Sequence, residues 1–115
     1  MRLLVIETAT PFLSLALFDQ QLLVGHHHAQ IGRGHAEALL PAIAALPDGG
    51  RADVIWVSCG PGSFTGIRVG LAAARALAFA WNAGLKGYRT AALIGANARS
   101  DCAIAMTGGH GEWFV

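Results

Sequence analysis

The sequence contains little charge, since only 13% of its 115 residues are Asp, Glu, Lys or Arg and the formal net charge is +1. So small a charged fraction, beside 54% hydrophobic residues, excludes a disordered chain. The near-neutral balance excludes a strong general attraction to nucleic acid, so we expect any such contact to depend on a partner. The apolar excess predicts that more surface than usual is buried in the core or covered by another protein.

Cysteines are scarce and long hydrophobic runs are missing. Cys59 and Cys102 lie far apart and form no CxxC pair, which argues against a zinc knuckle or a redox dithiol and predicts two buried thiols in a reducing compartment. The apolar run at residues 3–6 is too short for a signal peptide, and Arg75 interrupts the apolar stretch 69–81. We therefore expect a cytoplasmic protein without a membrane segment.

The hydrophobic pattern predicts an α/β fold in which helices pack on a mixed five-stranded sheet. The length of the chain, 115 residues, allows one compact domain or one lobe of a larger protein. The predicted strands are residues 3–6, 13–18, 22–28, 52–59 and 86–88, and the predicted helices are residues 36–46 and 67–82. A short helix over 90–98 and a further strand over 102–106 follow in the predicted order.

A glycine-rich turn over residues 60–66 lies between a buried strand and an alanine-rich helix. Gly60 and Gly62 permit positive φ and close backbone approach, and Ser63 or Thr65 can cap the helix and leave N–H groups free for an anion. The segment has no P-loop lysine, and its glycine spacing is one residue too long for the dinucleotide fingerprint. An anion-binding turn and a purely structural turn both remain open.

A second polar turn follows the first predicted strand and contains Glu7, Thr8 and Thr10. An acidic residue followed by hydroxyls can meet magnesium and phosphate at such a place, and it is also ordinary turn chemistry. We take these three residues as candidates for the same anion-binding site as the glycine turn.

Catalytic and metal-binding patterns are missing from the sequence. The three histidines at 26–28 alternate sides on a strand and have no third ligand at a fixed spacing, so no metal site is predicted. The chain has no HExxH, no GxSxG and no paired catalytic carboxylates, and Ser63 has no placed base. We therefore predict no catalytic residue and no cofactor.

Both predicted helices carry more apolar surface than we expect one sheet face to cover. In the first helix the apolar residues spread around more than one side, and in the second a stripe of small residues would let another helix approach closely. Packing of this stripe on the chain's own sheet is the alternative. The predicted partner interface consists of His35, Leu39, Leu40, Ile43, Leu46, Gly66, Gly70, Ala73, Ala74 and Leu77.

Three segments, residues 4–10, 34–41 and 60–70, resemble the TsaB (YeaZ) family in order and spacing. The last is an eleven-residue match to Gly-Pro-Gly-Ser-Phe-Thr-Gly-x-Arg-x-Gly. The resemblance implies an actin-like (ASKHA, RNase H-like) fold, with an N-terminal lobe over 1–106 and the start of a truncated second lobe over 107–115. Proteins of this family are non-catalytic subunits that dimerise with the catalytic subunit TsaD. With the ATPase TsaE they support N6-threonylcarbamoylation of adenosine 37 in tRNAs that read ANN codons.

The catalytic relatives share the Gly-Pro-Gly turn and carry a metal-binding His-x-x-x-His pair thirty residues after its first glycine. That count lands on Thr90 and Ile94, which are not such ligands. Glu7 stands where the family usually has Asp, and Thr107 where many relatives have an acidic residue. The resemblance therefore implies that this chain is the partner subunit of TsaD rather than the transferase itself. It also implies that tRNA is contacted only through other subunits. A homodimer of this chain is a further way to cover the two helices. The alternative is an actin-like nucleotide-binding ATPase or phosphotransferase.

Overall fold

The computed structural model describes residues 1–90, and the structural statements below concern that part of the chain. Two predictions lie outside these residues, namely the strand over 102–106 and the lobe boundary near 106. A third, the helix over 90–98, extends beyond them. The strands are β1 (Arg2–Glu7), β2 (Phe12–Asp19), β3 (Leu22–Gln30), β4 (Val54–Ser58) and β5 (Gly84–Tyr88). The helices are α1 (His35–Ala44), the short 3₁₀ helix η1 (Pro47–Gly50) and α2 (Phe64–Trp81).

The five strands form one mixed sheet in the order β3-β2-β1-β4-β5. β1, β2 and β3 pair antiparallel, whereas β4 pairs parallel to both β1 and β5. The tight turn between β2 and β3 is made by Gln20 and Gln21, which both have positive φ. The predicted hairpin and the predicted mixed sheet are therefore confirmed.

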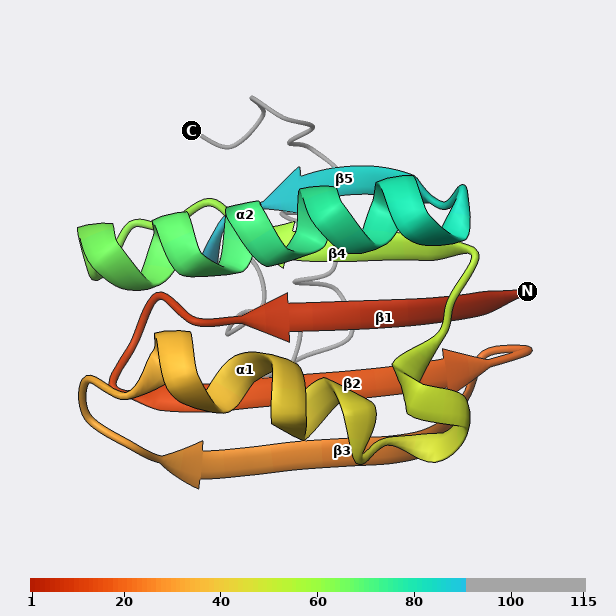
Figure 1. Ribbon diagram of the computed structural model, residues 1–115, viewed down its shortest axis with the longest axis horizontal. Helices are drawn as coiled ribbons and strands as arrows, with labels where there is room; N and C mark the ends of the chain where they lie inside the picture. Colours follow the sequence, from red (N-terminus) through yellow and green to blue (C-terminus); the bar gives the residue numbers. More distant parts are fainter. Residues whose placement is uncertain (91–115) are drawn as a thin grey trace, which may run out of the picture.

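Both α1 and α2 cover the same face of the sheet, where they lie side by side (Figure 1). Successive side chains of each strand therefore alternate between the face under the helices and the opposite face. In β2 the buried side chains are Leu13, Leu15 and Leu17. Within residues 1–90, neither helix combines the length and hydropathy needed to cross a bilayer. The core beneath the helices contains Leu4, Ile6, Leu13, Leu15, Leu17, Leu39, Ile43, Leu46, Ala52, Ile55, Val57 and Ala74.

This packing corrects much of the predicted partner interface. Leu39 is 1% exposed and Ala74 is fully buried, and both belong to the core. Five strands make a sheet broad enough to cover the apolar sides of two helices, so the alternative interpretation holds for these residues. The predicted interface residues buried in this way are His35, Leu39, Ile43, Leu46, Gly66, Gly70 and Ala74.

The remaining predicted interface residues differ in exposure. Leu40 is 54% exposed, while Ala73 and Leu77 are half-buried against the core. Contact of these three residues with a partner stays a prediction.

The prediction of buried thiols is wrong for Cys59, which is exposed directly after β4. Its sulfur lies beside Gly87 of β5, where a Cβ would collide with Sγ. The Cys59 thiol therefore lies at the end of β4, in the space left by the missing side chain of Gly87, and not in the core. Cys102 lies outside the described residues.

Candidate functional site

The two polar turns meet where the parallel strands end. β1, β4 and β5 run in the same direction, so the turns that follow Glu7 and Ser58 leave the same edge of the sheet. The amide of Ser63 donates to the carbonyl of Ala9 at 2.7 Å, which joins the two turns directly. The carboxyl edge of parallel strands, next to a change of strand direction, is a frequent ligand site in α/β proteins.

Glu7 is buried and accepts hydrogen bonds from three donors of its own chain. The amide of Ala9 donates to Oε2 at 2.9 Å, the hydroxyl of Tyr88 to Oε1 at 3.2 Å, and the hydroxyl of Thr90 to Oε2 at 3.4 Å. Burial, followed by the nearby carboxylate, raises the pKa of Tyr88, so its hydroxyl stays a donor. The carboxylate therefore joins β1 to β5 and to the segment after it.

The small residues of α2 let the helix lie very close to the first turn. Thr8 is fully buried, and its hydroxyl donates to the carbonyl of Gly66 at 2.6 Å. A Cβ on Gly66 would collide with the carbonyl oxygen of Thr8, and a Cβ on Gly70 would lie 2.5 Å from the Thr8 hydroxyl. The glycine spacing thus has a structural cause, which is the approach of α2 to β1.

The glycine turn itself is occupied by internal contacts. Ser63 caps α2 by accepting from the amide of Gly66 at 3.1 Å, which decides between the two capping residues, Ser63 and Thr65, that the sequence leaves open. Gly60 has positive φ, and a Cβ on Gly62 would collide with the carbonyl of Ala9. These contacts support the structural one of the two interpretations that the sequence leaves open.

Anion binding by these turns stays a prediction for Glu7, Thr8, Thr10, Gly60, Gly62, Ser63 and Thr65. The hydroxyl of Thr10 accepts from the amide of Phe12 at 3.1 Å and keeps its own proton to donate, and Thr65 is exposed. The Glu7 carboxylate beside the turns disfavours a bare anion. Among residues 1–90, no three His, Cys, Asp or Glu side chains are grouped so that they could hold a metal ion.

Sequence reasoning missed a row of polar side chains across the sheet. His28 pairs with Ser14, Ser14 with Glu7, and Ser58 with Tyr88, and all five residues lie on the face opposite α1 and α2. In this row Ser14 Oγ and His28 Nδ1 are 2.6 Å apart. The two-residue turn between β2 and β3 would by itself pair Ser14 with His27, but a register shift between Leu17 and Phe18 moves the pairing by one residue, so no local sequence signal indicates that Ser14 lies beside His28.

His35, a member of the predicted partner interface, packs within the chain. It is the first residue of α1 and is buried, and its Nε2 lies 3.1 Å from the carbonyl oxygen of Phe12. This contact joins the start of α1 to the start of β2.

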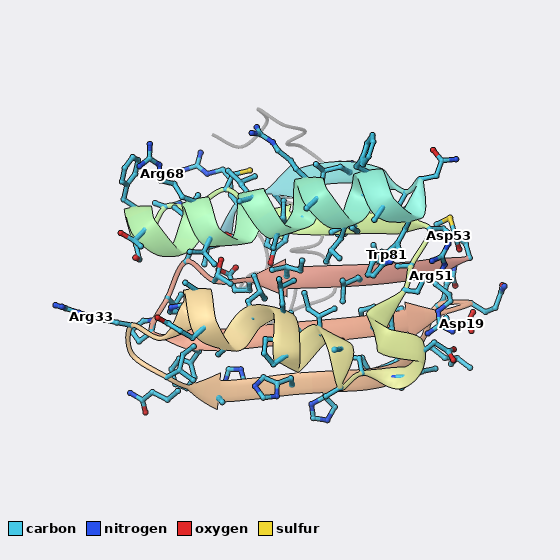
Figure 2. The ribbon with its side chains drawn as sticks, in the orientation of Figure 1. Asp19, Arg33, Arg51, Asp53, Arg68 and Trp81 are labelled. Carbon is cyan, nitrogen blue, oxygen red and sulfur yellow. The ribbon has the colours of Figure 1, made fainter. Side chains whose placement is uncertain are left out.

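The side of α2 that faces away from the sheet carries a row of large and charged side chains beside a row of alanines. We call this set the outward surface of α2. Its members are Phe64, Arg68, Ala72, Arg75, Ala76, Phe79 and Ala80, all of which are exposed. Arg68 lies over the ring of Phe64 at 4.6 Å and projects away from α1 (Figure 2).

Comparison with known proteins places the chain in a family. Residues 23–115 match the TsaD family model, described as tRNA N6-adenosine threonylcarbamoyltransferase. The chain is 34% identical to the tRNA threonylcarbamoyladenosine biosynthesis protein TsaB of Escherichia coli, over 68% of this chain and 36% of that protein. It is 28% identical to TsaB of Bacillus subtilis, over 86% of this chain and 45% of that protein. The chain belongs to the TsaB/YeaZ family.

Solved structures agree with the family. YeaZ from Pseudomonas aeruginosa superimposes with a TM-score of 0.76 at 31% identity, covering 87% of this chain and 50% of that one. The expected actin-like (ASKHA-type) α/β fold is therefore confirmed. An uncharacterized Mycobacterium tuberculosis protein is 35% identical over 88% of this chain. The chain spans about half the length of the curated relatives it matches, 51% of the M. tuberculosis protein and 45% of B. subtilis TsaB.

Proposed function

We propose that this TsaB/YeaZ chain is a non-catalytic subunit that pairs with a TsaD-type catalytic subunit in N6-threonylcarbamoylation of adenosine 37 of tRNAs that read ANN codons. The names of the E. coli and B. subtilis relatives support the pathway. The observation that carries the pairing is the outward surface of α2, on which Phe64 and Phe79 are 70% and 91% exposed. Large exposed apolar side chains on the same helix face as a row of exposed alanines are typical of a protein interface.

The shape of this surface fits a second helix. Ala72, Ala76 and Ala80 recur every four residues and form a low row along α2, so a partner helix can approach to about 8 Å. Phe64 and Phe79 stand near the two ends of the helix, about 22 Å apart along its axis, where they would fill pockets on the partner.

The charge of the same surface indicates the kind of partner. Arg68 and Arg75 project from α2, and the helix contains no acidic residue. An acidic helix on the partner would be attracted to this side, and the attraction would weaken with added salt. The partner helix is therefore expected to be apolar with acidic flanks.

The non-catalytic role is supported by Thr90, which stands at the position where catalytic relatives carry a metal-binding histidine. Its hydroxyl lies 2.8 Å from the hydroxyl of Ser58 and donates to Glu7. A threonine engaged in this way is a poor replacement for a histidine ligand. Ile94, at the second position, lies outside the described residues.

The proposal extends to the assembled complex. The ATPase TsaE joins the pair, tRNA is reached through the other subunits because the net charge is only +1, and the reaction takes place in the cytoplasm. Without a catalytic partner, two copies of this chain would cover the same helices as a symmetric homodimer.

Mixing the purified chain with a TsaD subunit and measuring the affinity by calorimetry tests the pairing. Phe79→Glu removes an anchor from the outward surface and should weaken the complex about 30-fold, corresponding to about 2 kcal/mol. The matched control is Leu22→Glu, which changes a side chain that is 69% exposed at the start of β3 and belongs to neither helix. Equal affinities for the two variants, or no heat for the wild type, would contradict the proposal.

A further inference from the structure

We propose that Ser14 and His28 form a nucleophilic dyad that accepts an acyl group from an activated ester or mixed anhydride. Ser14 Oγ lies 2.6 Å from His28 Nδ1, within the range of a short hydrogen bond. A histidine at this distance can take the hydroxyl proton as the serine attacks a carbonyl carbon. This inference is independent of the proposed pairing with a TsaD subunit, and neither requires the other.

The sheet holds both side chains in place. Ser14 and His28 are direct partners across the antiparallel strands β2 and β3, so their Cβ atoms are kept close together. The His28 ring also stacks on Phe12, with ring centroids 4.7 Å apart and planes 8° from parallel. Stacking restrains the plane of the imidazole, and His28 is an exposed residue, so a proton can leave to water.

The dyad borders a cavity of about 460 Å³ on the sheet face opposite the helices. Val5, Phe18 and Leu23 give this cavity an apolar wall, which suits the hydrocarbon part of an acyl compound. Thr10 lines the same cavity, and its hydroxyl oxygen accepts from the amide of Phe12, while no acceptor for its proton occurs among residues 1–90. That proton is the donor available to an oxygen that gains negative charge during attack.

The acyl transfer to Ser14 needs no reactant other than the acyl compound and water. Ser14 Oγ forms a bond to the carbonyl carbon, the bond from that carbon to the leaving oxygen breaks, and the leaving group departs with the electron pair. The serine proton passes to Nδ1 of a neutral His28 whose Nε2 carries the other proton, and the extra proton then moves to water. The product is an acyl ester on Ser14.

An alkyl fluorophosphonate tests the nucleophile, because it labels activated serines with loss of fluoride. Peptide mass spectrometry of the folded chain should find the label on Ser14, faster than on the exposed Ser63, which has no histidine partner among its described contacts. Ser14→Ala should remove this label, and His28→Gln should slow it about 100-fold, the size of a typical general-base contribution. His27→Gln is the matched control, since His27 also lines the cavity but pairs with Leu15 rather than with Ser14.

A second measurement guards against a folding defect in these variants. Ser14→Cys keeps the side-chain size, and iodoacetamide should alkylate the introduced thiol faster than Cys59 in the same molecule, with the advantage lost when His28→Gln is added. Circular dichroism checks that each variant is folded. Labelling of Ser14 no faster than Ser63, or equal rates with and without His28, would overturn the proposal, whatever the result with a TsaD subunit.

Discussion

Gly70→Ala should destabilise the protein, although a glycine-to-alanine change inside an exposed helix normally stabilises by about 0.5–1 kcal/mol. The new Cβ would lie 2.5 Å from the hydroxyl of Thr8 and 3.4 Å from Val57 Cγ2. Thr8 cannot turn away without losing its bond to the carbonyl of Gly66, and α2 cannot move outward without opening the core above β4. The close approach of helix and sheet therefore decides the sign of the effect.

The magnitude follows from two opposing contributions. Overpacking in a filled core costs about 1–3 kcal/mol, and the gain in helix propensity offsets less than about 1 kcal/mol of it. We expect a net loss of about 1–2 kcal/mol in the free energy of unfolding, measured by urea denaturation with an unchanged m value. Gly84→Ala is the control, because its Cβ would meet only Val54 at 3.8 Å and should change stability by less than about 1 kcal/mol.

A double-mutant cycle assigns the loss to the contact itself. Thr8→Ala removes the obstructing hydroxyl, so adding Gly70→Ala in that background should cost less than it does in the wild type. If Gly70→Ala stabilised the protein, or if the two changes were additive, the stripe of small residues on α2 could not be packed against Thr8 as described.

Two further predictions concern the cap and the tyrosine. Ser63→Ala should lower stability by about 1 kcal/mol through loss of the α2 cap, whereas Thr65→Ala should not, and equal thermal shifts would contradict the capping role. Burial and the Glu7 carboxylate raise the pKa of Tyr88, so the stability this group contributes is complete below tyrosine's ordinary pKa near 10 and is lost as the pH rises above it. Tyr88 is the only tyrosine of the chain, so phenolate absorbance should appear only with unfolding, and a phenolate signal near pH 10 from a protein with native circular dichroism would refute this.

Local patterns in the sequence predict most of the fold for identifiable reasons. The alternation in β2 and the Asp19-Gln20-Gln21 turn specify a hairpin, and the run 52–59 specifies a buried parallel strand, because each signal depends on neighbours along the chain. A cap of α2 at Ser63 or Thr65 is predicted for the same reason, and the structure selects Ser63.

The direction in which α2 faces depends on information that local patterns do not contain. Gly66 and Gly70 would suit a close helix partner or a close sheet equally well, and only the position of Thr8 across the turn decides between them. The exposed alanines of the outward surface are spaced like the buried small residues, so spacing alone does not separate the two rows. The Ser14–His28 contact is likewise set by strand register, fourteen residues apart in the chain.

Hydrogen exchange with mass spectrometry, with and without a TsaD subunit, tests the proposed pairing most directly. Pairing through the outward surface of α2 should slow exchange in peptides from α2 when the partner is present, and leave exchange in peptides from β2 and β3 unchanged. Protection confined to β2 and β3 would contradict the proposed pairing. So would the absence of protection in every peptide at protein concentrations well above the dissociation constant measured by calorimetry.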